Sequence, residues 1–262
     1  MPEGHTVHRL ARDHSKWLAG QKLEVSSPQG RFESEAKLLT GKTLKSVEAH
    51  GKHLYYTFSN KLVLHVHLGL YGKFRLHTAP PPEPRGAVRV RFLSRSHALD
   101  LNGPNQCEIL SNEESLNSKA KLGEDPLRSD ASPDRVWSRM VKSKKPIGQL
   151  LLDQTIIAGI GNIYRAEILF LLRIHPSRPS SSVQRSEFEE LWDMSVRLLE
   201  LGVKYNRIIT VGRDDTDKPL SRLSTDERLW IYKKDHCPVC RSKTQAWLLG
   251  NRQMFACSVC QT

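Results

Sequence analysis

Four cysteines near the C-terminus place the strongest constraint on what this chain can fold into. They form two pairs, with two residues inside each pair and 16 residues between the pairs. Two such knuckles facing each other across a hairpin can surround one tetrahedral zinc ion with four thiolates. Disulfides would not persist in a reducing cytosol. The sequence therefore predicts one structural Zn²⁺ ion, with the ligands Cys237, Cys240, Cys257 and Cys260.

The charge balance of the 262-residue chain indicates the kind of partner it binds. It has 40 lysine and arginine residues against 28 acidic ones, a net charge of +12. This excess favours a polyanion such as nucleic acid, with an acidic membrane surface as the alternative. The sequence has no signal peptide and no apolar run long enough to cross a bilayer. We therefore expect a soluble, cytoplasmic protein that binds nucleic acid.

The hydropathy pattern divides the chain into a strand-rich part and a helical part. The chain opens with apolar residues at helical spacing, and this helix ends near Gly20. Short alternating runs within residues 43–110, at 53–58, 62–68 and 87–92, are separated by glycines and prolines and predict a β-sandwich. A polar stretch, 111–133, is typical of a linker. The segments with helical periodicity that follow are 135–142, 147–153, 163–172 and 187–201.

The N-terminus holds a candidate nucleophile. Met1 is followed by Pro2, a small residue that permits removal of the methionine, and the proline then carries a free secondary amine. An α-amino group has a pKa of roughly 7.7 to 8.0, so part of it is neutral near pH 7. Its attack on C1′ of a sugar would give an iminium ion, an electron sink for elimination, while Glu3 exchanges protons with the sugar oxygen. The alternative is structural, because proline and glutamate also suit the first turn of a helix.

Three further positions are candidates for contacts with DNA, and each has a structural alternative. Lys52 follows a glycine before an apolar strand, where it either contacts DNA or is a solvated charge at a turn. Asn162 begins a helix after the turn 159–161, which could bind phosphate or simply cap two helices. Arg252 lies at the tip of the predicted zinc hairpin, where a guanidinium can bind a phosphate through two hydrogen bonds, although an exposed arginine is usually unremarkable. Cys107 is expected to be an inert buried thiol.

Five motifs, in this order along the chain, resemble the formamidopyrimidine-DNA glycosylase and endonuclease VIII family. They are Met-Pro-Glu-Gly at 1–4, Gly-Lys at 51–52, His-Leu-Gly-Leu-Tyr-Gly at 67–72, Gly-Ile-Gly-Asn-Ile-Tyr at 159–164, and the zinc hairpin with Gly-Asn-Arg at 250–252. The resemblance implies an α+β multidomain protein, with an N-terminal β-sandwich with flanking helices and a C-terminal helix–two-turn–helix domain with a zinc-finger hairpin. The expected ranges are 1–115 for the catalytic domain, 116–133 for a linker, 134–225 for the helix–two-turn–helix domain and 226–262 for the zinc finger.

The resemblance also implies a role for each site residue. Pro2 would be the nucleophile, Glu3 the general acid and Lys52 a contact in the catalytic site. Asn162 and Arg252 would bind the phosphates that flank the lesion. The partner would be DNA that contains oxidised bases or abasic sites, bound by a monomer. The damaged nucleotide must leave the base stack to be reached.

Agreement with the family and departures from it both bear on the substrate. Leu70 and Tyr71 match the wedge that fills the space left by the damaged nucleotide. His5 and Thr6 replace the usual Pro-Glu, and residues 100–106 lack the Arg-Arg-Phe motif of the purine-directed branch. The chain thus resembles a divergent, second-type bacterial endonuclease VIII, which would remove oxidised pyrimidines and cleave the strand by β,δ-elimination. An oxidised-purine glycosylase and a non-catalytic DNA-binding protein are the alternatives.

Overall fold

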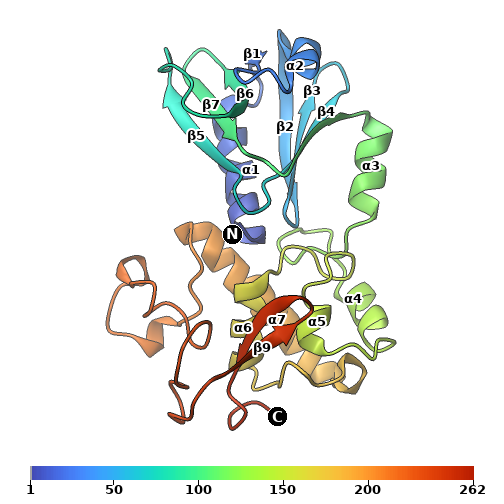
Figure 1. The fold of residues 1–262 in the computed structure, drawn as a ribbon. Coiled ribbons are helices and arrows are strands. Elements are labelled where there is room, and N and C mark those ends of the chain that lie inside the picture. Colours follow the sequence, from blue (N-terminus) through green and yellow to red (C-terminus); the bar gives the residue numbers. More distant parts are fainter. Residues whose placement is uncertain (1) are drawn as a thin grey trace. The chain divides into compact units, whose positions relative to one another are not determined.

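The computed structural model describes residues 2–262, which form two compact units. The first unit comprises Pro2 and Val7–Lys121, and the second comprises Glu3–Thr6 and Leu122–Thr262. Figure 1 labels their helices and strands. The boundary after Lys121 falls inside the polar stretch that the sequence marks between its strand-rich and helical parts.

The first unit is a β-sandwich of two four-stranded halves. One half has the strand order β5-β7-β6-β1 and the other the order β2-β3-β4-β8, and the short antiparallel pairing of β1 with β2 joins them. Figure 1 shows the two halves as separate layers. The strands are β1 (Lys22–Ser26), β2 (Lys42–His50), β3 (His53–Phe58), β4 (Val63–His67), β5 (Lys73–Thr78), β6 (Val88–Leu93), β7 (His97–Asn102) and β8 (Gln106–Leu110).

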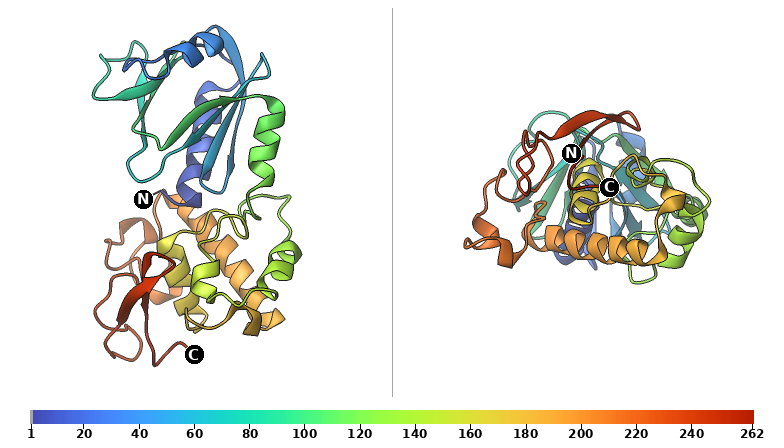
Figure 2. Two further views of the ribbon diagram at one scale, coloured as in Figure 1. Left: turned by 45° about the vertical axis from the view of Figure 1, so that its right-hand side comes forward. Right: turned by 90° about the horizontal axis from the view of Figure 1, so that it is seen from below.

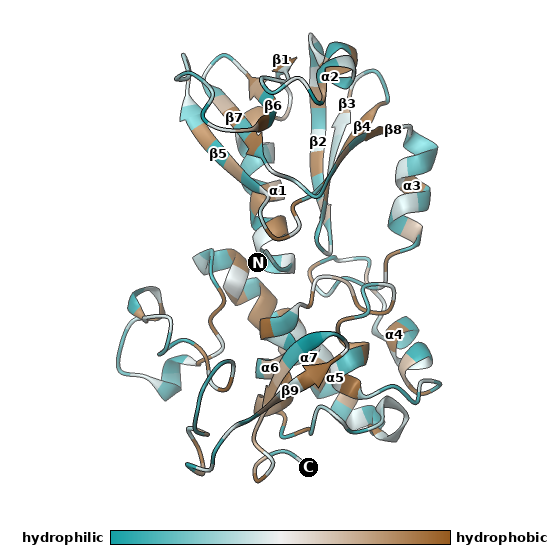
Figure 3. Ribbon diagram, viewed as in Figure 1, coloured by the Kyte–Doolittle hydropathy of each residue, from teal (hydrophilic) through white to brown (hydrophobic). Residues whose placement is uncertain are grey.

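Alternation of apolar residues explains how the sandwich closes. In β6 the side chains of Val88, Val90 and Phe92 are buried and those between them are partly exposed, as expected for a strand with one face on a core. The helix α1 (Gly4–Leu18) adds its own apolar stripe to this core, and α2 (Glu33–Leu39) packs beside β1. Figure 3 shows apolar residues recurring along these strands.

A helix occupies the start of the stretch that the sequence marks as a linker. α3 (Asn112–Ala120) begins with a capping box, in which the Ser111 hydroxyl accepts from the N–H of Glu114 and the Glu114 carboxylate accepts from the N–H of Ser111. Each of these bonds satisfies an N–H that would otherwise have no partner at the helix start. The polar stretch 111–133 therefore begins with a helix that the sequence interpretation did not predict.

The second unit is helical. Its core gathers apolar side chains from α6 and α7, among them Tyr164, Ile168 and Phe188. α7 is the long helix in the right-hand view of Figure 2. The helix expected over 147–153 ends earlier, at Leu150, and the chain passes through turns until α6 begins at Asn162. The α-helices are α4 (Pro133–Met140), α5 (Ile147–Leu150), α6 (Asn162–Leu171) and α7 (Arg185–Tyr205), and the short 3₁₀ turns are Ser180–Ser182, Arg213–Asp215 and Leu220–Arg222.

The second unit ends in a β-hairpin between β9 (Gln245–Leu249) and β10 (Arg252–Ala256). Gly250 and Asn251 connect the strands, and both have positive φ, +62° and +58°. A two-residue turn of this kind matches the twist of paired strands. The hairpin predicted between the cysteine pairs is therefore present. Among the described residues, no helix combines the length and the apolar character needed to span a membrane.

Candidate active site and metal centre

Glu3 lies against the N-terminus of α6. Its two carboxylate oxygens accept hydrogen bonds from the backbone N–H groups of Gly161 and Ile163, each at 2.9 Å. The residue is buried, with 1% of its surface exposed. The start of a helix carries N–H groups without helical partners and a partial positive charge, so it stabilises a carboxylate. Glu3 is thus held in one orientation by the turn in which the sequence predicts a phosphate site.

Glycines at this turn make room for the N-terminal segment. A Cβ atom at Gly161 would lie 2.3 Å from Cδ of Glu3, and one at Gly4 would lie 2.8 Å from Cα of Gly159. The N–H of Gly4 donates to the carbonyl of Gly159 at 2.8 Å. The sequence interpretation offers either phosphate binding or helix capping for the turn 159–161. In the structure, the missing side chain of Gly161 makes room for Glu3, and that of Gly4 makes room for the backbone of Gly159.

His5 is buried beside the same turn and contributes no charge to it. Its ring packs edge-on against Tyr164, with 5.3 Å between the ring centroids, and the missing side chain of Gly202 leaves room for both. Burial lowers the pKa of His5 to about 4, and the positive charge of Arg228 adds to this shift. The imidazole is therefore neutral at physiological pH.

Lys52 lies in the two-residue turn between β2 and β3. Gly51 has a φ of +59°, and His50 faces His53 across the turn. Burial lowers the pKa values of His53 and His67, and the positive charge of Lys52 contributes to both shifts. Lys52 therefore lies close to a group of histidines in the first unit.

Leu70 and Tyr71 project from the turn between β4 and β5. The turn is closed by a hydrogen bond from the N–H of Gly72 to the carbonyl of Leu68, at 2.9 Å, and a Cβ at Gly72 would lie 2.3 Å from that oxygen. The two apolar residues are 58% and 81% exposed. Exposure of this kind suits a wedge between bases, which stays a prediction.

Asn162 is joined to the hairpin by Arg165, a residue that the sequence interpretation missed. Asn162 Nδ2 donates to the carbonyl of Gln253 at 2.9 Å, and its Oδ1 accepts from Arg165 Nη2 at 2.7 Å. The fully buried Arg165 also donates to the carbonyls of Gly148, Leu249 and Arg252. The available signal was an arginine three residues after Asn162, on the same face of a largely apolar helix.

Burial of this guanidinium is compensated by its carbonyl acceptors. Desolvation lowers the pKa of Arg165 to about 10, which still leaves the side chain charged at neutral pH. A buried charge is tolerated where hydrogen bonds replace the lost water. The arrangement fixes the backbone of Arg252, whose own side chain is exposed at the start of β10. One N–H of the Asn162 amide remains for a further acceptor.

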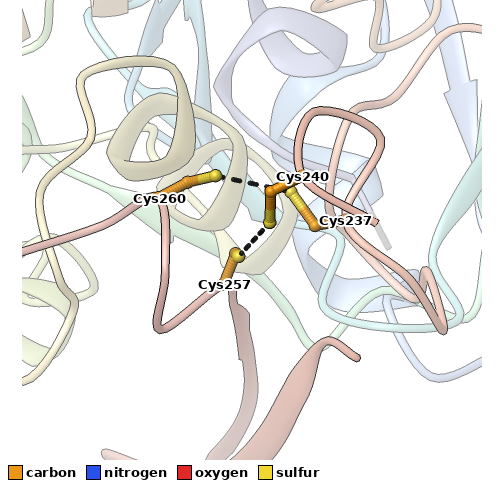
Figure 4. Close-up of side chains that lie close together, drawn as sticks. All are labelled: Cys237, Cys240, Cys257 and Cys260. Carbon is orange, nitrogen blue, oxygen red and sulfur yellow. Dashed lines mark hydrogen bonds between the residues drawn. The ribbon is translucent and has the colours of Figure 1, made fainter. Parts of the chain in front are cut away.

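The four cysteines converge as their spacing predicts (Figure 4). All four sulfur atoms lie within 4.8 Å of one another, with 3.8 Å between Cys237 and Cys260 and 3.4 Å between Cys240 and Cys257. Four sulfurs bound at ~2.3 Å to one tetrahedral zinc ion would be about 3.8 Å apart. The donor set and its spacing therefore fit a bound zinc ion, and the predicted convergence of the four cysteines in a cluster that could hold a metal ion is confirmed.

Comparisons with known proteins agree with these features. Residues 1–107 match the formamidopyrimidine-DNA glycosylase N-terminal domain, and residues 122–213 match the formamidopyrimidine-DNA glycosylase H2TH domain. The chain belongs to this family. Endonuclease 8 1 of Mycobacterium tuberculosis is 46% identical to it over 268 residues, covering all of both chains.

Solved structures of glycosylases from the same family resemble the chain over its whole length. A complex of Lactococcus lactis Fpg with DNA that contains an abasic site has a TM-score of 0.82 at 27% identity, covering 99% of both chains. A complex of the same wild-type protein with DNA that contains an oxidised pyrimidine has a TM-score of 0.80 at 28% identity, again over 99% of both chains. The predicted fold class, and the prediction that the chain is an enzyme of the DNA glycosylase class, are confirmed.

The predicted catalytic and DNA-binding residues of this glycosylase fall into two groups. Glu3, Asn162 and Arg252 lie in the second unit, where hydrogen bonds connect them to α6 and the hairpin. The others lie in the first unit, and Pro2 among them is half-buried. Their catalytic and DNA-binding roles stay predictions. The removal of Met1 concerns a residue outside the described part of the chain. The members of the first-unit group are Pro2, Lys52, Leu70 and Tyr71.

Proposed function

We propose that this glycosylase is bifunctional: it removes oxidised bases from DNA and then cleaves the strand, with the amine of Pro2 as nucleophile after removal of Met1. The observation that carries the proposal is the fixed carboxylate of Glu3, which directly follows Pro2 in the chain. A buried carboxylate with two backbone donors next to a potential secondary amine suits proton transfer at the same reacting centre.

The mechanism begins with displacement of the damaged base. The Pro2 nitrogen forms a bond to C1′, the glycosidic bond breaks and the base leaves with its bonding electrons. Opening of the sugar ring gives an iminium ion. Loss of the C2′ proton then expels the 3′ phosphate, and a second elimination expels the 5′ phosphate. Because a secondary amine gives an iminium without a removable N–H proton, the positive charge persists through both eliminations.

The surroundings of Glu3 suggest the order of proton transfers. Its two N–H partners and the helix N-terminus favour the ionised carboxylate. We therefore propose that Glu3 first accepts the proton that the Pro2 amine gives up on attack and then donates it to the sugar ring oxygen as the ring opens. In this order Glu3 acts as the general acid of the second step, using a proton that it gained in the first.

Oxidised pyrimidines are the proposed substrates. The connection between β7 and β8 is short, Gly103–Asn105, and carries no counterpart of the Arg-Arg-Phe motif. The 46% identical relative bears the name endonuclease 8, which also favours this branch. Excision of thymine glycol or 5-hydroxyuracil should exceed excision of 8-oxoguanine in side-by-side assays on matched duplexes. The reverse order would support the oxidised-purine alternative.

DNA is held, in this proposal, by both units of a cytoplasmic monomer. Lys52 would contact the catalytic site, and the free N–H of Asn162 together with the Arg252 guanidinium would bind flanking phosphates. Residues 134–225 would form the DNA-binding domain and 226–262 the zinc finger. Zinc would supply no chemistry of its own, because a site with four protein ligands leaves no open position. Its part would be to hold the hairpin that carries Arg252.

The decisive experiment is borohydride trapping on lesion-containing DNA. Reduction of the iminium should link the Met1-free protein covalently to DNA, whereas protein that retains Met1, as read from its mass, should bind DNA without being trapped. Pro2→Gly keeps an amine, so its trapping must be compared quantitatively and should be reduced. No adduct with Met1-free protein, or an undiminished one in Pro2→Gly, would count against the mechanism. DNA binding without excision would support the non-catalytic alternative.

A further inference from the structure

Two rows of polar side chains cross the β2-β3-β4-β8 half of the sandwich. The strand register places His50 opposite His53, His53 opposite His67, and His67 opposite Gln106. In the second row, Glu48 faces Tyr55, Tyr55 faces His65 and His65 faces Glu108. Because side chains two residues apart share one face of a strand, all eight lie on one side of this half-sheet. The first row begins beside the turn that carries Lys52.

Hydrogen bonds connect the two rows through their histidines. His65 Nδ1 lies 2.9 Å from a carboxylate oxygen of Glu108, and His65 Nε2 lies 2.8 Å from Nδ1 of His53. His65 is buried, while the Glu108 side chain is half exposed. The rings of Tyr55 and His65 are stacked 4.9 Å apart, and those of His53 and His65 are 5.1 Å apart. The histidines are thus held by packing as well as by hydrogen bonds.

Helix α3 fixes the other end of the second row. The hydroxyl of Tyr55 is hydrogen-bonded to that of Ser118 at 3.0 Å. Lys119 places its ammonium 4.8 Å from the Tyr55 ring centre and 2.8 Å from the carboxylate of Glu48. The stack in which His65 lies is therefore closed by a helix rather than open to water. An imidazole in such surroundings has few alternative orientations.

We propose that Glu108, His65 and His53 form a hydrogen-bonded chain that fixes the tautomer of His53 and thereby positions Lys52, an inference that rests on the proposed function of Lys52. An ionised carboxylate only accepts, so His65 carries its proton on Nδ1. An imidazole that carries its single proton on Nδ1 offers Nε2 as an acceptor, so in this arrangement His53 donates to His65 from its own Nδ1. This leaves Nε2 of His53 without a proton.

Because the turn between β2 and β3 is short, the position of His53 restricts that of Lys52. Gly51 and Lys52 alone separate the paired residues His50 and His53, so the backbone of Lys52 moves with that of His53. Burial lowers the pKa of His53 to about 3, and the positive charge of Lys52 adds to this shift. His53 therefore stays neutral beside Lys52. The hydrogen bonds from Glu108 through His65 thus make His53 a positioning residue for Lys52.

The test replaces His65 by phenylalanine, which keeps an aromatic ring against Tyr55 but removes both hydrogen bonds of the chain. Two-bond ¹H–¹⁵N spectra of the full protein report which nitrogen of each histidine carries the proton. In the unaltered protein, His53 and His65 should both be Nδ1–H tautomers, and in His65→Phe the His53 signal should become that of a tautomer mixture. An Nε2–H tautomer of His53 in the unaltered protein would overturn the proposal.

Kinetics supply the second readout. His65→Phe should lower kcat for lesion excision on the order of 10-fold with KM changed by less than about twofold, because misplacement of a catalytic group affects the chemical step. Glu108→Gln keeps an acceptor oxygen and should stay within about twofold, whereas Glu108→Leu should resemble His65→Phe. An unchanged kcat in both His65→Phe and Glu108→Leu would overturn the proposal.

His14→Phe is the matched control. His14 is also a buried histidine of the first unit, hydrogen-bonded to the hydroxyl of Tyr56, which points to the opposite sheet face from Tyr55. Its replacement should leave kcat and the His53 spectrum unchanged, and an equal loss of kcat would indicate general disturbance and overturn the proposal. If the unaltered protein excises no lesion, the proposed function fails. The spectra then still decide whether the hydrogen-bonded chain of Glu108, His65 and His53 exists.

Discussion

Replacing Gly161 by alanine tests whether the turn before α6 exists to hold Glu3. The backbone of Gly161 has φ −122° and ψ −162°, an extended conformation that alanine adopts without strain. The added Cβ would nevertheless lie 2.3 Å from Cδ and 2.6 Å from Cγ and Oε1 of Glu3. The clash must displace a buried carboxylate from its two N–H partners.

The expected loss of stability follows from these contacts. Overpacking of an interior costs about 1–3 kcal/mol, and each hydrogen bond to a charged group contributes about 1.5–3 kcal/mol. Because Glu3 can retain part of its bonding after a shift, we expect Gly161→Ala to lower the free energy of unfolding by about 2–4 kcal/mol. In a Glu3→Ala background the obstacle is gone, and the same substitution should change stability by less than about 0.5 kcal/mol.

Urea unfolding followed by tryptophan fluorescence measures this double-mutant cycle. Four of the five tryptophans lie in the second unit, as does the Glu3 contact, and Trp17 alone lies in the first, so the signal reports mainly the affected unit. The four are Trp137, Trp192, Trp230 and Trp247. A coupling free energy near zero, with Gly161→Ala equally damaging in both backgrounds, would refute the reasoning. The loss would then come from the backbone of the turn and not from Glu3.

Three other predictions concern DNA binding, the metal and acid stability. Arg252→Ala should weaken DNA binding and reduce the slope of log K against log salt by about one phosphate contact, and an unchanged slope would contradict its role. Cys257→Ser should release zinc, as measured by a metal indicator, and should weaken DNA binding, while the free Pro2 amine remains titratable. A variant with full zinc content and full DNA affinity would argue against the metal site. Burial lowers the pKa of His14 from 6.5 to about 3, so the folded state keeps this ring neutral while the unfolded chain takes up a proton. The stability that depends on neutral His14 is complete above pH 6.5 and is lost as the pH falls toward 3. Between pH 7 and pH 5, the free energy of unfolding should therefore fall by about 2 kcal/mol more in the unaltered protein than in His14→Phe. Equal losses in the two proteins would exclude this cause.

The parts of the fold that follow from local patterns could be predicted from the sequence. The cysteine spacing predicted the four-cysteine cluster because the ligands of one ion must meet regardless of the rest of the fold. Strand β3 was predicted with its observed bounds, since its apolar residues lie between clear turn signals. The helix α3 was missed because its composition is polar, although Ser111 and Glu114 already carried the signature of a capping box.

The hydrogen-bond partners within the site could not be predicted in the same way. Glu3 and Gly161 are separated by 158 positions, and Arg165 meets the hairpin more than 80 residues further along the chain. No periodicity links residues so distant, because their contact depends on how whole elements pack. The glycines of the turn illustrate this limit: their identity was informative, but the partner that requires them was visible only in the structure.

The anchoring of Glu3 has a practical consequence for anyone who purifies this protein. The two hydrogen bonds of the Glu3 side chain join it to the turn before α6, and neither requires a free N-terminus. An affinity tag fused ahead of Pro2 would therefore leave this anchoring in place, while it converts the proposed nucleophile into an amide. Such a preparation would pass every test of folding and still be inert toward lesions, so tags belong at the C-terminus or behind a cleavage site that exposes Pro2.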